Sequence, residues 1–462
     1  MRYSLAISFL LSMLLAACNG SQNKNHIPLA ERFDPETQSY AFAIPNLPPV
    51  PGIPGLRARD CGQCHQTIYQ EWRLSTHATA LRDIQFQAEL AKPDSPKWIC
   101  LNCHIPLQNQ RQHIVTYLAD GDIFQPVTTE NAHFDEALQR EAVTCATCHV
   151  RAVSDSSSVI IGPNGSQAAP HPVQQKREFL REMCQRCHNP QGEGLTPNLI
   201  CWFETTRELA DAQDLVKAEF GEQRDCVDCH MPAAQRRVAD TFLELPVRAV
   251  NAHSWVGSGI PKWYDGYDHL LERGYQAGLQ VEIRDVQLVG DDSVHAAISL
   301  KNSFAGHDLP TGDPERFLLV LAILEAADGK RLQQDSLKIG QEWLWSPARK
   351  IGDNRLNFGE TRVWRVALPN DARANKMIVM IYNVRLKAEN ARHMMQTQGV
   401  NEAFLPDGQK LVQELGEHYP FAMVIYREEI DLQSGQRRRL NSKELIALSR
   451  LEKGKPLEER DY

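Results

Sequence analysis

The sequence predicts an α+β fold with two unlike parts, a region of short helices followed by an antiparallel β-sandwich and a terminal helix. Between residues 61 and 230 one pentapeptide, Cys-x-x-Cys-His, occurs five times, and consecutive copies place their histidines 39, 45, 39 and 42 residues apart. From about residue 277 the pattern changes, because apolar and polar residues begin to alternate. Alternation with a period of two indicates strands with one buried face.

The repeated pentapeptide is the attachment signature of c-type haem. Its two thiols bond to the porphyrin vinyl groups, and the histidine becomes the proximal ligand of the iron. The ten motif cysteines are Cys61, Cys64, Cys100, Cys103, Cys145, Cys148, Cys184, Cys187, Cys226 and Cys229, and the motif histidines are His65, His104, His149, His188 and His230. A zinc ribbon needs no histidine after every cysteine pair, and a thioredoxin-like redox pair needs none either. We therefore predict five covalently attached haem c groups.

The predicted haem domain runs from about residue 57 to 260. About 40 residues separate consecutive motifs, which is too few to build a separate core around each porphyrin. The haems are therefore expected to pack against the same protein segments and to lie near one another. Two helices are expected here, QTIYQEWRLSTHATA after the first motif and VQQKREFLREMCQRCH leading into the fourth.

Residues 275–432 are predicted to form the β-sandwich. LQVEIR and VHAAISLK each place apolar residues on one face, and Asp328-Gly329 is a hairpin signal. Further strands are expected in RVWRVAL, KMIVMIYNVRL and FAMVIYREEIDL. Residues 433–462 are predicted to hold a C-terminal helix and tail, because Asn441 and Glu444 form a capping box.

The N-terminus predicts secretion and lipid anchoring. Residues 1–17 read as a signal peptide, and Leu15-Ala16-Ala17-Cys18 resembles the bacterial lipobox, in which the cysteine is lipidated. The alternative is an ordinary leader with a coincidental cysteine. We expect the chain on the periplasmic side of a bacterial membrane, and Asn19 allows the outer membrane.

Residues 18–56 are predicted to be a proline-rich tether, a semi-rigid spacer that holds the haem domain off the membrane. An extended arm packed on the domain surface is an equal alternative.

Composition narrows the function further. The net charge is −8 and no strongly basic stripe occurs, which argues against a nucleic-acid partner. Ten of the 12 cysteines lie in the motifs, so no disulfide framework is needed. Apart from Cys18, this leaves Cys201, which lies beside Trp202 and Phe203 and is expected to be a buried, inert thiol rather than a ligand.

Eleven further histidines could close the sixth coordination site of the irons. The predicted distal ligands are His77, His171, His253, His307 and His133, with His113 a weaker candidate. His77 follows His65 by twelve residues on one predicted helix, a rise of about 18 Å. It therefore cannot reach the far side of its own haem and should serve another.

With these residues in hand, the chain resembles the multihaem cytochromes related to cytochrome c-554, the electron acceptor from hydroxylamine oxidoreductase. The resemblance is carried by CGQCHQTIYQEWRLSTHATA, by AVTCATCHV with APHPV, by CVDCHMP and by AHSWVGS. GHDLPTGDPER and GDNRLNFGETR are similar to the β-rich extension of many such proteins. The resemblance implies that His77, His171 and His253 are distal ligands. Ala142 stands where the family usually has glycine, which alters a turn and not a ligand. The chain has one motif more and a large added domain, so the family's partner is not carried over.

The predicted function is electron transfer along the haem row between redox proteins whose identity the sequence does not give. Bis-histidine ligation lacks the methionine that raises haem potential, which favours low potentials and anaerobic respiration. The alternative is an oxidoreductase in which one open haem acts on hydroxylamine or nitrite. The second haem is the candidate, because Arg111 and His113 follow its motif; the lysine-ligated motif of nitrite reductases is absent from the sequence. Membrane contact is expected through the lipid, and self-association is left open.

Overall fold

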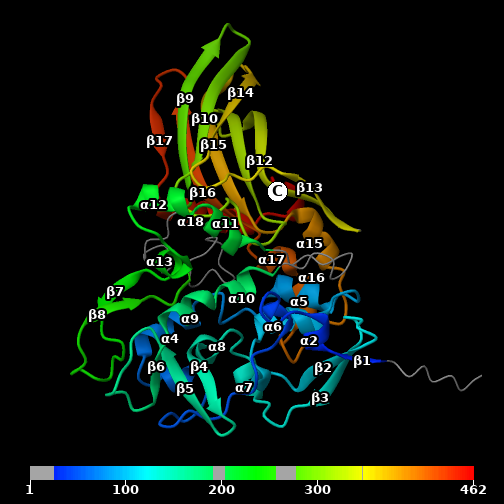
Figure 1. The fold of residues 1–462 in the computed structure, drawn as a ribbon. Helices are drawn as coiled ribbons and strands as arrows, with labels where there is room; N and C mark the ends of the chain where they lie inside the picture. Colours follow the sequence, from blue (N-terminus) through cyan, green and yellow to red (C-terminus); the bar gives the residue numbers. More distant parts are fainter. Residues whose placement is uncertain (1–24, 191–202, 256–276, 346) are drawn as a thin grey trace, which may run out of the picture.

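A computed structural model describes residues 25–190, 203–255, 277–345 and 347–462. Two parts lie one above the other in Figure 1, a lower region of short helices and small sheets and an upper β-sandwich. This arrangement is the predicted α+β class, with the motif region preceding the β-rich region. Among the described residues no helix is long and apolar enough to cross a membrane.

The lower part contains short elements only. Its helices are α3 (Ala58–Gly62), α4 (Gln66–Arg73), α5 (Ile84–Ala91), α6 (Lys97–His104), α7 (Glu136–Gln139), α8 (Cys145–His149), α9 (Arg177–Glu182), α10 (Gln185–His188), α11 (Thr205–Asp211), α12 (Gln213–Phe220) and α13 (Cys226–His230). Its strands are β2 (His113–Ala119), β3 (Pro126–Glu130), β4 (Val150–Ser154), β5 (Ser157–Gly162), β6 (Val173–Gln175), β7 (Ala233–Arg236) and β8 (Arg248–Asn251). The elements are short because only about 40 residues separate consecutive motifs.

The segment that was expected to be a tether is packed on the lower part over its described residues. It contains β1 (His26–Pro28), which pairs with β2, then α2 (Leu29–Arg32) and a 3-10 turn at Ser39–Ala41. Ile44, Leu47 and Val50 are buried against Leu107 and Leu138. The prolines keep the backbone extended, while the apolar residues between them give the arm a face to bury. The packed arm, and not the free spacer, describes residues 25–56.

Both predicted helices of the motif region are shorter than expected. Helix α4 ends at Arg73, so His77 lies beyond it in a run of turns. The segment before the fourth motif divides into strand β6 and the helices α9 and α10. The spacing of apolar residues predicted longer helices than the structure contains, because packing around the motifs, and not helix propensity, sets where each helix ends.

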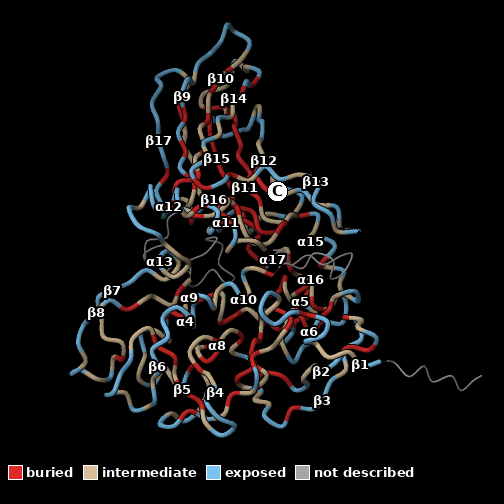
Figure 2. The backbone as a smooth tube through the Cα atoms, in the orientation of Figure 1, coloured by how far each residue is buried: buried red, intermediate tan, exposed pale blue. Residues whose placement is uncertain are grey.

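The upper part is a sandwich of two antiparallel sheets. One sheet has the order β14-β10-β9, and the other has the order β13-β12-β11-β15-β16-β17. The strands are β9 (Leu279–Val289), β10 (Ser293–Asn302), β11 (Phe317–Ala326), β12 (Arg331–Trp345), β13 (Ala348–Asp353), β14 (Thr361–Pro369), β15 (Ala374–Val384), β16 (Ala422–Asp431) and β17 (Arg437–Arg439). Apolar residues from both sheets, among them Ile298, Val320 and Val379, form one core between them. Figure 2 shows this buried layer running along the facing strands.

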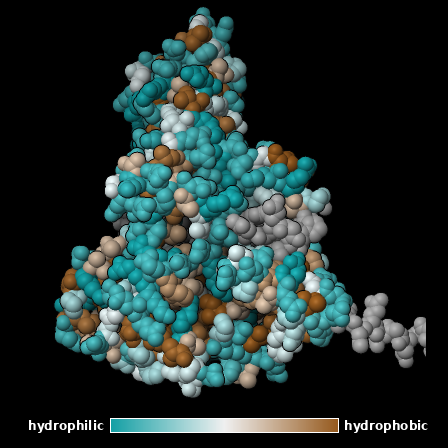
Figure 3. All heavy atoms as spheres, viewed as in Figure 1, coloured by the Kyte–Doolittle hydropathy of each residue, from teal (hydrophilic) through white to brown (hydrophobic). Residues whose placement is uncertain are grey.

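The sequence prediction missed a helical insertion between β15 and β16. It contains α15 (Ala388–Met394), α16 (Gly408–Gln413) and α17 (Leu415–His418). Leu386, Val412 and Leu415 from this region pack against Ile84 and Ala88 of α5, so the insertion joins the sandwich to the lower part. The terminal helix α18 (Ser442–Lys453) begins at the predicted capping box, where Asn441 and Glu444 bond each other's backbone. Hydrophilic residues predominate on the face shown in Figure 3, with apolar ones scattered among them.

Candidate haem sites

Each motif lies on or beside one turn of helix. The second, third and fifth motifs are contained in α6, α8 and α13, the first spans the end of α3, and the fourth spans α10. Residues three and four apart lie on one helical face, so both cysteines and the histidine of a motif project to the same side. The fifth motif also begins at a side-chain cap, where Asp225 accepts from the backbone of Val227 and Asp228.

Three motif histidines are held by backbone carbonyls. Nδ1 of His65 lies 2.6 Å from the Val238 oxygen, that of His104 2.7 Å from the Ala80 oxygen, and that of His149 2.8 Å from the Ile161 oxygen. A carbonyl can only accept, so Nδ1 donates in each case and Nε2 keeps its lone pair. This is the tautomer that binds a metal through Nε2, with the ring orientation fixed by the second hydrogen bond.

Three predicted distal histidines lie opposite motif histidines from distant parts of the chain. The ring centres are 6.1 Å apart for His149 and His253, 6.2 Å for His188 and His77, and 6.3 Å for His230 and His307. A metal–imidazole bond is about 2 Å long and each ring centre lies about 1 Å behind its nitrogen, so two imidazoles on one metal have centres about 6 Å apart. The three pairs therefore have the spacing that a shared iron requires.

His171 lies near His65. His65 is the histidine of the first motif, and it takes no part in the three pairs. Burial lowers the pKa of His171, and the charge of His65 contributes to the shift. Its Nδ1 is buried and has no hydrogen-bond partner among the described residues. A buried ring nitrogen without a hydrogen-bond partner is expected where a bound group, which the protein chain does not provide, completes the surroundings of the residue.

Burial keeps these imidazoles neutral. It lowers the pKa of His77 to about 3 and the pKa values of His188 and His253 to about 4. A neutral imidazole is the form that ligates iron, and a buried imidazolium would need an anion beside it.

The second motif has different surroundings. Phe86 of α5 stacks face to face on the His104 ring, with the ring centres 3.4 Å apart and the planes 2° from parallel. Arg111 is buried and donates to the carbonyls of Ile105 and Trp98, so its charge is turned toward backbone oxygens. The sequence pattern gave no sign of the phenylalanine, because it precedes His104 by 18 residues and lies on another helix.

The structure does not bring His133 or His113 beside a motif histidine. Both are exposed, His113 at the start of β2 and His133 in the turn after β3, and neither makes a ring contact with a described residue. The backbone N–H of His133 donates to Asn131 Oδ1, which fixes the turn with the imidazole pointing outward. Cys18 and Cys201 lie outside the described residues.

A buried ion pair holds the loop that carries His253. Glu71 of α4 accepts from both terminal nitrogens of Arg236 at 2.6 and 2.9 Å, and its Oε2 also accepts from the backbone N–H of His253 at 2.9 Å. The sequence alone does not pair Glu71 with Arg236, because 165 residues separate them.

A second ion-pair group holds the loop that carries His307 and joins the two parts of the molecule. Arg355 of the upper part lies 2.5 Å from Glu208 of α11 and 3.3 Å from Asp308, which follows His307. Glu208 also accepts from the Thr311 hydroxyl at 2.6 Å. The sandwich therefore supplies one histidine to the motif region and anchors it there.

Pairs of cysteines from different motifs lie close together. Cys61 and Cys145, Cys103 and Cys187, and Cys184 and Cys226 are near enough for one thiol to shift the pKa of the other. The charge of Cys187 likewise contributes to the raised pKa of Cys148. The motifs are therefore neighbours in the order first, third, fourth and second, with the fifth beside the fourth.

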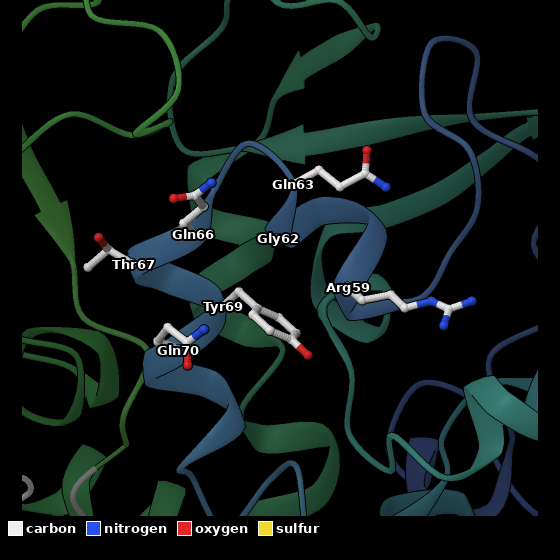
Figure 4. A pocket seen from close by; sticks show the side chains of 7 residues that line it. All are labelled: Arg59, Gly62, Gln63, Gln66, Thr67, Tyr69 and Gln70. Atoms are coloured by element: carbon white, nitrogen blue, oxygen red, sulfur yellow. The ribbon is translucent and has the colours of Figure 1, made fainter.

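An open hollow of about 550 Å³ lies against the first motif. Arg59, Gln63, Gln66 and Gln70 stand around it in Figure 4, with Tyr69 directed into it. The first motif is therefore near the protein surface.

Known proteins are similar to this chain in sequence over one segment and in fold over most of it. The family model "Cytochrome c554 and c-prime" matches residues 60–150. No curated protein sequence matches the chain. The crystal structure of a penta-heme cytochrome c552 from Thermochromatium tepidum has a TM-score of 0.52 and 18% identity, covering 83% of this chain and 98% of that one.

Two other solved structures match only locally. The C-terminal domain of wzt is 15% identical over 24% of this chain and 63% of its own, with a TM-score of 0.15. A β-glucuronidase from Bacteroides uniformis is 16% identical over 23% of this chain and 11% of its own, with a TM-score of 0.13. The family match covers the segment that holds the first three Cys-x-x-Cys-His motifs, and the penta-heme structure shares the fold of most of the chain.

Proposed function

We propose that this chain binds five haem c groups and carries electrons along them between respiratory redox proteins. The observation that carries the proposal is the set of opposed imidazoles, His149 with His253, His188 with His77, and His230 with His307, 6.1 to 6.3 Å apart. His65 with His171 supplies a fourth pair by proximity. The bound haems supply reversible one-electron chemistry at iron. The chain fixes their spacing, closes their axial sites and excludes water.

The proximity of cysteines from different motifs supports one connected set of haems with a branch. Because each motif cysteine bonds a haem edge, motifs whose cysteines touch hold haem edges side by side. The proposed order is first, third, fourth and second, with the fifth branching from the fourth. The hollow beside the first motif and the exposed Cys229 of the fifth are the places where a partner could approach the row.

Neutral imidazoles on both sides of an iron predict low midpoint potentials, because a methionine ligand is what raises them. Every haem with such a pair is expected to titrate below about +200 mV. A potentiometric titration in which all five haems lie above this value would contradict bis-histidine ligation.

Visible and EPR spectra of the haem-loaded chain test the proposal directly. The expected result is five haems per chain. The four haems that have a paired distal histidine should be low-spin and indifferent to carbon monoxide in the reduced state. Replacing His253 by Ala should convert one haem to a high-spin form, and replacing the exposed His133 by Ala should not. Fewer than five haems in the wild-type chain would overturn the count.

The second motif supports an alternative, an oxidoreductase with one open haem. Four predicted distal histidines lie near the other four motif histidines, and the two candidates for the second motif, His113 and His133, are exposed. Uptake of carbon monoxide by one haem of the wild-type chain, with turnover of hydroxylamine or nitrite, would favour this alternative.

We also propose that Cys18 is lipidated and holds the chain on the periplasmic side of a membrane, with the outer membrane allowed by Asn19. Cell fractionation tests this: the wild-type chain should sediment with membranes, and the Cys18→Ser chain should be released from them.

A further inference from the structure

Arg316 is a half-buried cation at the junction of the two parts, and it makes no ion pair with a described residue. It follows the turn of residues 311–315 and directly precedes β11. Its Nε is completely covered and has no hydrogen-bond partner, and among the described residues none of its side-chain nitrogens makes a hydrogen bond or an ion pair.

Charged groups of both signs surround Arg316. Burial and the charge of another cation, Arg385, lower the pKa of Arg316, and the charges of Asp313 and Asp83 act in the opposite direction. Both carboxylates are engaged elsewhere: Asp313 Oδ1 accepts from the backbone of Glu315, and Asp83 accepts from the backbone of Phe86 and from the Tyr419 hydroxyl. A guanidinium nitrogen that is shielded from water and has no hydrogen-bond partner can take a further anion.

Arg316 acts electrostatically on the fourth motif. Its charge is close enough to His188 to contribute to the lowered pKa of that imidazole. In the lower part, α10 carries His188, while Arg316 comes from the sandwich, so the two meet only because the parts are docked. A haem held by His188 and His77 would bring two propionate carboxylates into this neighbourhood. Carboxylate is the anion that a guanidinium binds best, through two parallel hydrogen bonds.

We propose that Arg316 binds a propionate of the haem that His188 holds, so that the sandwich domain fixes and tunes a haem of the other domain. The inference rests on the proposed function to the extent that the fourth motif carries a haem between His188 and His77. A cation beside the iron stabilises its ferrous form, because oxidation adds a positive charge. Arg316 therefore raises the potential of this haem and keeps its propionate ionised.

The test is a redox titration of the full-length, haem-loaded chain with Arg316→Gln, followed by optical and EPR spectra. One midpoint potential should fall and the other four should stay, and the shifted haem should be the one whose potential rises in His77→Met. Its potential should also become pH-dependent in the acid range, rising as pH falls, because the propionate loses the cation that lowered its pKa. Arg316→Lys should restore part of both effects.

Arg373→Gln is the matched control. Arg373 is exposed and pairs with Asp371 at 2.6 Å, so the substitution makes the same change in net charge away from the motifs. The inference is wrong if the Arg316→Gln chain carries five haems and has the same midpoint potentials and the same pH profile as the Arg373→Gln chain. Four haems in the wild-type chain would instead overturn the proposed function. A structure of the wild-type haem-loaded chain gives a test that needs no variant: the guanidinium should lie within about 3.2 Å of a propionate oxygen, and a longer distance contradicts the inference.

Discussion

The indole of Trp255 packs edge-on against the imidazole of His77, with the ring centres 4.7 Å apart and the planes at 63°. The same indole lies 5.3 Å from the His253 ring at 84°. One side chain thus contacts the proposed distal ligands of the fourth and third haems. Its backbone has φ +43°, a left-handed conformation that a bulky residue adopts only where its surroundings enforce it.

Trp255→Ala should therefore disturb two haems at once. Edge-to-face aromatic pairs contribute about 0.5–1.5 kcal/mol each, so losing both should lower the free energy of unfolding by about 1–3 kcal/mol. EPR should show changed g-values for two low-spin haems and unchanged values for the rest. Trp364→Ala in the sandwich serves as the comparison, because it should reduce stability without changing any haem signal.

Glu71→Ala should be among the most destabilising substitutions in the lower part. The side chains of Glu71 and Arg236 are 7% and 15% exposed, so removing the carboxylate leaves a buried, unpaired guanidinium. Breaking such a pair costs about 3–5 kcal/mol. The His253 loop also loses an anchor, so one haem should become partly high-spin.

Urea denaturation followed by haem absorbance measures this effect. Glu282→Ala removes an exposed partner of Arg284, with side chains 53% and 66% exposed, and should leave the free energy of unfolding almost unchanged. Equal losses in the two variants would contradict a role for burial.

Gly52→Ala should displace the loop that carries His171. A Cβ at Gly52 would lie 1.9 Å from the Pro170 carbonyl oxygen, and the residue has φ +86°. Gly329 has nearly the same φ, +84°, with nothing within 4 Å of its Cβ position. Gly329→Ala therefore measures the conformational penalty alone, about 1–2 kcal/mol. The Gly52 variant should lose more, and only it should alter the EPR signal of one haem.

Stability should fall as pH rises because of Glu315. Burial, with the charges of Asp313 and Glu89, raises the pKa of Glu315 to about 8, although Lys92 and Lys387 act in the opposite direction. The folded chain then binds a proton more tightly than the unfolded chain, so this group stabilises the fold below pH 4.5 and loses that contribution between about pH 4.5 and 8.

Glu315→Gln should remove this pH dependence, because the amide stays neutral at every pH. Denaturation midpoints measured between pH 5 and 8 should decline less steeply in the variant than in the wild-type chain. Parallel profiles for the two chains would show that other groups govern the decline. Glu417→Gln, at an exposed position, controls for the change in net charge.

Local residue patterns were sufficient to predict several features. The pentapeptide predicts the attachment residues, alternation predicted strands that the sandwich contains, and Asn441 with Glu444 marked the start of the last helix. Each of these is decided within a few residues of chain, by the spacing of a helical turn, by the two faces of a strand, or by a cap. His77 was expected on one helix with the first motif, but α4 ends at Arg73, and the position of His77 opposite His188 comes from the tertiary structure.

Other features depend on which distant residues meet. His77 opposes His188 across 111 residues of sequence and His307 opposes His230 across two parts of the molecule. The exposed position of His133, the packing of the arm at Ile44 and the helices between β15 and β16 were equally beyond local inspection. A histidine has the same chemistry wherever it lies in the chain, and burial, a carbonyl at Nδ1 and an opposing imidazole are what distinguish a ligand from a surface residue. Those three conditions exist only once the chain has folded, and so only the tertiary structure could decide them.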